Sequence, residues 1–131
     1  MTKKQQRQKV YEKFDGYCAY CGNPLAGKFH VDHLIPVERI FKWENGKHVA
    51  TNKMENPELD CFENMMPSCP PCNIAKSSLK LEAFRDIVAD KLNMLKREAN
   101  YRTALRYGLV KENPIKIVFH FEKDSVTADT V

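Results

Sequence analysis

The residues best suited to chemistry lie in two Cys-x-x-Cys pairs and in the stretch between them. Cys18 and Cys21 form the first pair, and Cys69 and Cys72 form the second. Four thiolates satisfy a tetrahedral zinc ion, and two residues between paired cysteines let both sulfurs reach one metal. A single pair could equally hold reactive or incidental thiols. Two pairs in one chain favour a structural zinc site with all four positions filled.

The distance between the pairs indicates what such a zinc site would hold. Residues 22–68 separate them, whereas simple four-cysteine modules have a gap of about 15–20 residues. We therefore expect the ion to join the ends of a domain whose working residues lie inside the gap. The fifth cysteine, Cys61, is interpreted as a small hydrophobic side chain.

Asp32 and His33 stand side by side inside the gap and could serve a hydrolytic reaction. A histidine can take a proton from water because its ordinary pKa is about 6.5. A divalent cation on a carboxylate can neutralise a phosphate and stabilise the departing oxygen. An Asp-His pair alone is weak evidence for a catalytic site, since histidines on strands are more often structural. Asn64, Asn73 and Lys76 strengthen it by their places between and just after the zinc pairs.

Taken in order, these residues form one array: Cys18-x-x-Cys21, Asp32-His33-x-x-Pro36, Asn64, and Cys69-x-x-Cys72-Asn73-x-x-Lys76. The array resembles the HNH endonucleases, and its motifs cover about residues 10–85. Residues 81–85 and 107–123 are similar to the C-terminal parts of small phage and bacterial members. The resemblance implies an α+β protein with a ββα-metal (His-Me finger) core, a structural four-cysteine zinc site and flanking helices. It also implies a single nuclease domain over residues 1–131.

The resemblance implies a role for each matching residue. His33 corresponds to the general base that activates water, and Asp32 to a ligand of the catalytic metal. Asn64 corresponds to the asparagine that steadies the base through a hydrogen bond. Asn73 stands where many members have a final histidine, which makes an HNN variant and favours Mg²⁺ or Mn²⁺ over softer ions. Lys76 would contact a phosphate as a point charge.

Other features of the same region remain open. His30 shares a strand face with Asp32, so it could be an extra metal or phosphate contact, or an exposed histidine with no role. Many family members have a Gly-Gly pair after the proline, whereas this chain has Val37-Glu38. The insert at residues 37–60 is also longer than the motif needs. The shape of the DNA-facing loop therefore does not follow from the resemblance.

Local patterns predict the elements that must position these residues. We expect a helix from residue 3 to about 15 that stops at Gly16, then turns over 17–27. Residues 28–32 alternate as a strand with Phe29 and Val31 facing the core and His30 and Asp32 facing out. Further along we expect a loop or loose hairpin at 37–60, a short turn at 63–67 and a short helix at 71–77.

The C-terminal third shows helical and then alternating patterns. Apolar residues recur every three or four positions over 81–107, which predicts a long helix with a break near Asn100. Residues 115–121 alternate as a late strand, and the last ten residues are expected to fray.

Charge and composition bear on partners and compartment. The net charge is +4, and basic residues dominate the N-terminal helix: Lys3, Lys4, Arg7, Lys9 and Lys13 against Glu12. Such a run is either a solvated helix face or an arm that contacts phosphates, and the resemblance favours DNA contacts by Lys3, Lys4 and Arg7. The chain has no apolar run long enough for a membrane and no secretory pattern. We expect an intracellular, cytoplasmic location, in a bacterium or a phage-infected cell.

The leading hypothesis is a metal-dependent endonuclease that nicks DNA or cuts it with loose specificity, leaving 5′-phosphate and 3′-hydroxyl ends as the family does. One alternative is a non-catalytic zinc module that binds nucleic acid or protein. Another is a junction-resolving nuclease with the same metal fold, whose dimerising helices could resemble the pattern at 81–107.

Overall fold

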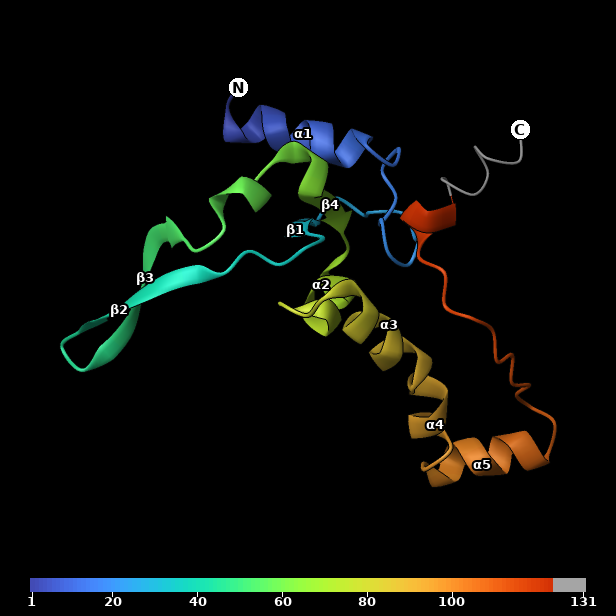
Figure 1. The fold of residues 1–131 in the computed structure, drawn as a ribbon. Helices are drawn as coiled ribbons and strands as arrows, with labels where there is room; N and C mark the ends of the chain where they lie inside the picture. The colour runs from blue at the N-terminus through green and yellow to red at the C-terminus, as the bar shows by residue number, and fades with distance from the viewer. Residues whose placement is uncertain (124–131) are drawn as a thin grey trace.

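Two antiparallel strands and the helix that follows them form the centre of the fold. The computed structural model describes residues 1–123. Strand β1 (His30–His33) pairs with β4 (Met65–Ser68), and α2 (Pro70–Lys76) begins almost directly after β4. Figure 1 shows α2 beneath this strand pair. The α+β class with a ββα core is confirmed, and so is the short helix expected at 71–77.

A β-hairpin is inserted between the two strands of this core. Strand β2 (Arg39–Glu44) pairs with β3 (Lys47–Met54). The connecting Asn45-Gly46 has positive φ at both positions, 52° and 75°, as a two-residue hairpin turn requires. The hairpin reaches away from the rest of the molecule as an arm (Figure 1). Of the two forms expected for residues 37–60, the hairpin is confirmed. Two 3₁₀ turns, η1 (Pro57–Leu59) and η2 (Phe62–Asn64), lead from it to β4.

The short turn expected at 63–67 is wrong for most of its length. Only η2 is a turn, and Met65–Ser68 is a fully buried strand. Pro67 lies opposite Val31 in the ladder, and its carbonyl accepts a hydrogen bond from the Ala19 amide. In a two-stranded sheet each strand has an edge where a missing N–H costs little, so proline is tolerated there.

The N-terminal helix is confirmed but is shorter than expected. Helix α1 (Lys3–Glu12) starts with a capping box between Thr2 and Gln5 and is followed by a turn that ends at Gly16, with φ 84°. Strand β1 likewise begins two residues later than the predicted strand.

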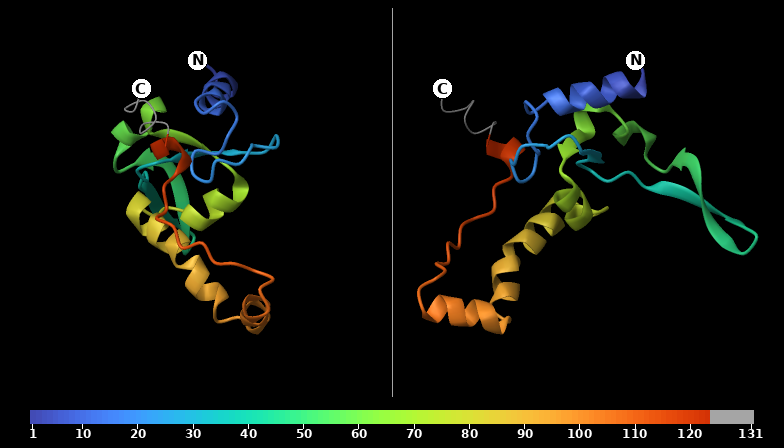
Figure 2. Two further views of the ribbon diagram at one scale, coloured as in Figure 1. Left: turned by 90° about the vertical axis from the view of Figure 1, so that its right-hand side faces the viewer. Right: turned by 180° about the vertical axis from the view of Figure 1, so that it is seen from behind.

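The long helix expected over 81–107 is three shorter helices: α3 (Leu81–Ala89), α4 (Lys91–Leu95) and α5 (Ala99–Arg106). Asp90 separates the first two. The break expected near Asn100 occurs slightly earlier, at residues 96–98, where the Glu98 carboxylate accepts from the Tyr101 amide and begins α5. Figure 2 shows α5 far from the core, with the following segment running alone back to it.

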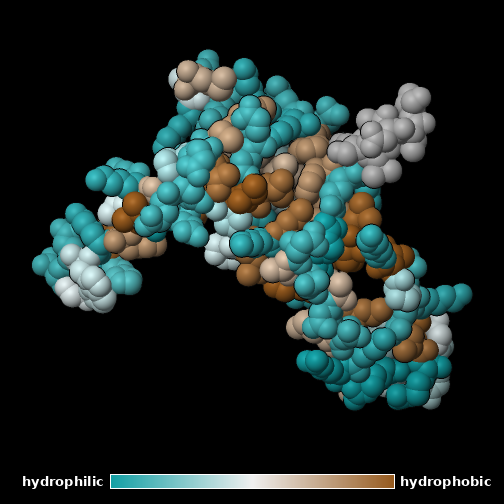
Figure 3. Space-filling model, in the orientation of Figure 1, coloured by the Kyte–Doolittle hydropathy of each residue, from teal (hydrophilic) through white to brown (hydrophobic). Residues whose placement is uncertain are grey.

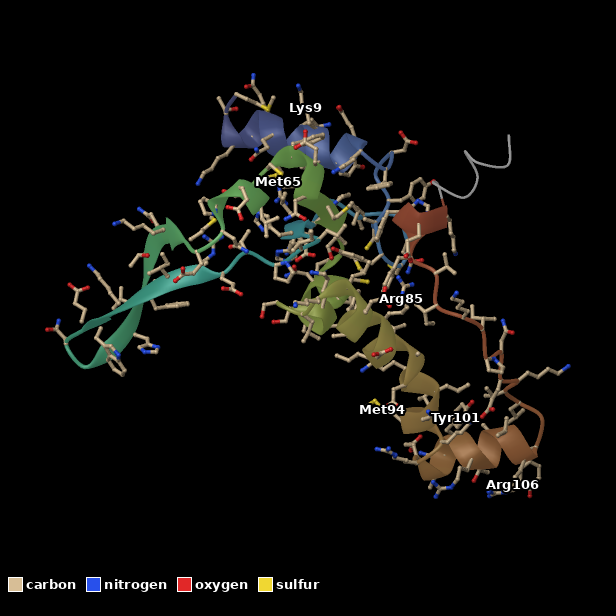
Figure 4. All side chains as sticks on the ribbon, in the orientation of Figure 1. Lys9, Met65, Arg85, Met94, Tyr101 and Arg106 are labelled. Carbon is tan, nitrogen blue, oxygen red and sulfur yellow. The ribbon has the colours of Figure 1, made fainter. Side chains whose placement is uncertain are left out.

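The strand expected at 115–121 is wrong. Residues 111–119 are extended without a strand partner, and residues 120–123 make a helical turn. Arg85 of α3 holds this segment by donating to the Ile117 carbonyl at 2.7 Å and to both carboxylate oxygens of Glu122 at 2.7 and 2.9 Å. Figure 4 shows Arg85 on α3 facing the returning segment. Most of the ten residues expected to fray lie outside the described part of the chain.

The core lies between the first cysteine pair, β4, α3 and the returning segment. Its buried members are Cys18, Ala19, Tyr20, Leu25, Met66, Phe84 and Phe119. Apolar surface gathers over the middle of the molecule and again over the α4–α5 end, whereas the hairpin arm is mostly polar in this view (Figure 3). The core is small, so cross-links between its parts should matter for stability.

Candidate metal centre and active site

The four cysteines of the two pairs meet in one cluster. Their sulfur atoms all lie within 4.8 Å of one another, and Cys21 Sγ is 3.7 Å from Cys69 Sγ. A tetrahedral zinc ion with bonds of about 2.3 Å places its sulfur ligands about 3.8 Å apart. The donor set and its spacing therefore fit a tetrahedral metal. Cys61 is half-buried and is not part of the cluster.

The electrostatics of the cluster fit a cation. The pKa of Cys18 is lowered to about 4, chiefly by a hydrogen bond from Cys72 and also by backbone amides. The same pairing raises the pKa of Cys72, and burial raises that of Cys21 to about 11. Without a positive ion the four thiols cannot all lose their protons, since each thiolate charge repels the formation of another beside it. A divalent metal would remove that opposition.

Asp32 is buried on β1, although alternation predicted that it would face out. The residue is 8% exposed, and its Oδ2 atom accepts from the Tyr20 hydroxyl at 2.5 Å. Burial and the Asp32 charge raise the pKa of Tyr20 well above its usual range, which keeps this phenol a proton donor. Tyr20 lies between the first two cysteines and was not singled out from the sequence. A large aromatic inside a metal knuckle was the only signal.

Lys76 was predicted to contact a DNA phosphate, but in this structure its side chain is 0% exposed. Its Nζ atom donates to the His33 carbonyl at 3.0 Å and lies 3.1 Å from Asp32 Oδ2. Lys76 therefore holds both members of the Asp32–His33 pair from α2. Within residues 1–123 Asp32 Oδ1 has no hydrogen-bond partner, so one oxygen of this carboxylate remains available.

The His33 ring faces a carboxylate that sequence reasoning missed. His33 Nε2 lies 2.9 Å from Asp60 Oδ1, with the two side chains 17% and 40% exposed. An ionised carboxylate can only accept, so Nε2 carries the proton, and in the neutral ring Nδ1 carries the lone pair. Asp60 closes η1, in the insert where no motif pointed to it.

Asn64 fixes the chain just after His33. Its side-chain amide donates to the carbonyls of Ile35 at 2.9 Å and Leu59 at 2.8 Å, and its Oδ1 accepts from the Ile35 amide at 2.8 Å. The Leu34 amide also donates to the Asn64 carbonyl. The expected hydrogen bond from Asn64 to the base is therefore replaced by bonds to the backbone that carries the base.

Lys13 supports Asn64 from outside. Its ammonium group donates to the carbonyls of Phe62 at 3.0 Å and Met65 at 2.8 Å, on either side of Asn64. Burial lowers the Lys13 pKa. This member of the basic N-terminal run thus ties α1 to the site.

A comparison with protein families agrees with this geometry. The family model described as HNH endonuclease matches residues 18–79, from the first cysteine of the cluster to just past Lys76. Residues 18–79 are therefore similar to an HNH endonuclease domain. Searches of curated proteins and of solved structures gave no match. The HNH domain relates the chain to metal-dependent nucleases that act on DNA.

The remaining residues expected to act with the HNH domain lie around it. Asn73 is half-buried on α2, one turn before Lys76, and His30 is exposed at the start of β1. Lys3 and Lys4 are exposed on α1. Arg7 is also exposed, but it bonds the Phe29 carbonyl and its guanidinium lies 3.9 Å from the centre of the Phe29 ring. Among the helices of residues 1–123, none has the length and apolar character that a membrane span requires.

Proposed function

We propose that the protein is a metal-dependent endonuclease that hydrolyses DNA phosphodiester bonds by nicking or by loosely specific cleavage. The observation that supports this best is how firmly the Asp32–His33 pair is held. Lys76 and Tyr20 hold Asp32, Lys76 holds the His33 carbonyl, and Asn64 holds the chain that follows. Such rigidity is what a site needs when it must place a base against a reacting atom.

The proposed base is His33, acting through Nδ1. Because Nε2 donates to Asp60, the free lone pair on Nδ1 can take a proton from an attacking water. The water oxygen then forms a bond to phosphorus while the bond from phosphorus to the 3′ oxygen breaks. The departing 3′ oxygen takes up a proton from solvent water, and the products carry a 5′-phosphate and a 3′-hydroxyl. Asp60 stabilises the imidazolium that forms.

Two kinds of metal fit the residues present. Asp32 Oδ1 and the Asn73 amide oxygen would hold Mg²⁺ or Mn²⁺, since both are the hard oxygen ligands these ions prefer. Two protein ligands suit Mg²⁺, which usually keeps several waters and binds substrate phosphate. Such an ion supplies charge to neutralise the phosphate and the departing oxygen. For the four-cysteine cluster we propose Zn²⁺ with a structural role.

DNA contacts are proposed for the exposed side of α1. Lys3 and Lys4 are free to approach phosphates. Arg7 could do so with the guanidinium N–H groups that do not bond the Phe29 carbonyl. Contacts of this kind raise affinity without reading sequence, which agrees with nicking or loose specificity.

Metal dependence tests the proposal directly. Supercoiled plasmid incubated with the protein and Mg²⁺ or Mn²⁺ should become relaxed circles, then linear DNA. Zn²⁺ alone should not support this conversion, because the oxygen ligands offered by Asp32 and Asn73 favour Mg²⁺ or Mn²⁺ over softer ions. Gel separation of the plasmid forms measures the rates. If linear, supercoiled and branched DNA all stay intact with every metal, the protein is a zinc module that only binds.

Asp60→Asn should lower the maximal cleavage rate about tenfold and leave the DNA concentration for half-maximal rate unchanged. The amide keeps the size of the side chain but loses the charge that stabilises the imidazolium. Rates measured against DNA concentration separate the two quantities. Asp60→Glu, which keeps the charge, should recover part of the rate. Equal losses in both variants together with a lower melting temperature would assign Asp60 a purely structural role.

A further inference from the structure

The β2–β3 hairpin carries an aromatic face that is directed away from the core. Register places Phe41 opposite Ala50 and Trp43 opposite His48, so Phe41, Trp43 and His48 share one side. Trp43 and His48 rings lie 4.3 Å apart, and Phe41 and His48 rings 6.2 Å. Trp43 is 72% exposed and Phe41 is 55% exposed. Large aromatics left so open indicate a binding surface.

The opposite side of the hairpin is polar. Lys42 lies opposite Val49, and Glu44 lies opposite Lys47. The one acid of the hairpin, Glu44, is 3.6 Å from Lys42, which leaves Arg39, Lys47 and Lys53 as its excess charge. The aromatic face is therefore carried by a positively charged arm. Its occupant is expected to combine apolar rings with negative charge, as nucleic acid does.

The arm is also continuous with the active site. A hollow of about 640 Å³ lies at its base, and Ile35, Arg39, Phe41 and Lys80 are among the residues that line it. Ile35 follows His33 closely and is held by Asn64, while Phe41 belongs to both the hollow and the aromatic face. One acid, Glu38, shares the lining with the two cations. A strand bound at His33 could thus run along the hollow and reach the aromatic face.

We propose that this face, formed by Phe41, Trp43 and His48, stacks on unpaired bases next to the cleaved phosphate. The inference rests on the proposed nuclease function and names its substrate: DNA with single-stranded character, such as a flap, gap or branch. In an intact duplex the base faces are covered by their neighbours, whereas unpaired bases offer them to aromatic side chains. The hollow with Arg39 and Lys80 would accept the phosphates of the same strand.

The sequence provides a direct probe, because Trp43 is the sole tryptophan. Its fluorescence should be quenched when single-stranded oligonucleotides are added to His33→Ala, which is expected to cleave too slowly to consume the DNA during the measurement. Intact duplex of the same sequence should quench little. Equal quenching by duplex and single strand would overturn base stacking in favour of a groove contact. A signal that changes with protein concentration and ignores DNA would assign the face to a protein partner.

Variants extend the test to affinity. Trp43→Ala should weaken the binding of a labelled flap substrate about 5- to 150-fold, the loss of one stacked base, with less than a twofold change for duplex. Trp43→Phe should keep most of the affinity. Tyr107→Ala is the matched control, since its ring is 78% exposed at the far end of α5. If Trp43→Ala binds flap DNA like the parent while the parent still cleaves DNA, this inference fails and the nuclease proposal stands.

Discussion

Replacing His33 by alanine should lower the rate of plasmid cleavage in Mg²⁺ by about 10²- to 10⁴-fold, the usual contribution of a general base. The loss should fall on the chemical step, since the ring is expected to take a proton from water. Folding should be unaffected, because the side-chain contact that positions the ring is the surface-accessible one with Asp60. Rates from single-turnover cleavage, together with circular dichroism, measure the two effects separately.

Imidazole added to the buffer provides the sharpest control for this variant. A small base that diffuses into the space left by His33 should restore part of the activity, and it cannot repair a misfolded site. His30→Ala is the matched histidine variant, because His30 lies exposed on the same strand. Its cleavage rate should stay close to that of the parent if the residue has no role, and a comparable loss would identify it as an extra contact. Equal cleavage by His33→Ala and the parent would refute the general-base assignment.

The elements predicted correctly are those whose reasons are local. The spacing of the paired cysteines predicts a four-sulfur cluster, and the structure brings the four sulfur atoms together. Helix α1 carries its capping box in Thr2 and Gln5, and the hairpin carries its turn in Asn45-Gly46. Each of these features depends on a few neighbouring residues, so it can be predicted from a short stretch of sequence.

Sequence reasoning missed the surroundings of residues whose contacts come from distant parts of the chain. Lys76 looks like a surface cation, yet a carbonyl and a carboxylate from β1 satisfy its ammonium group inside the core. Asp60 has no motif, and only the fold of the insert brings it to His33. Both depend on long-range contacts that local patterns do not encode.

Sequence reasoning missed strand β4 and predicted a strand at 115–121 that does not form, and the two errors have a related cause. Residues 63–67 were expected to form a turn, but Met65–Ser68 pairs with β1, and Pro67 offers its carbonyl to the Ala19 amide at the other edge of β4. Residues 115–121 have the alternation of a strand but form no strand pair. The Arg85 side chain binds the Ile117 carbonyl, and the amides of His120 and Phe121 donate to the Tyr20 and Ala19 carbonyls from a helical turn. Strand formation needs a pairing edge as well as a pattern.

Loss of the metal cluster should have the largest effect on the protein as a whole. Cys69→Ser should release the zinc ion and leave the chain largely unfolded at room temperature. Zinc binding to sites of this kind contributes on the order of 10–16 kcal/mol at neutral pH, and it is available only to the folded chain. Here the ion would join the turn that contains Cys18 and Cys21 to the start of α2. The link would fix the position of α2, the helix that contains Asn73 and Lys76.

Cys61→Ser is the matched control for this prediction, because Cys61 lies outside the cluster. Metal analysis should find one zinc per chain in the parent and in Cys61→Ser, and a reduced content in Cys69→Ser. Thermal unfolding should be cooperative in the first two proteins and absent or strongly lowered in the third. A Cys69→Ser protein that keeps full zinc and a parental melting temperature would rule out a structural zinc site made by the four cysteines. A parent that lacks zinc but folds would show that the small core suffices and that the cysteines serve another purpose. The outcome therefore decides whether the fold that carries Asp32 and Asn73 depends on the zinc ion, and so whether cleavage needs two metals or one.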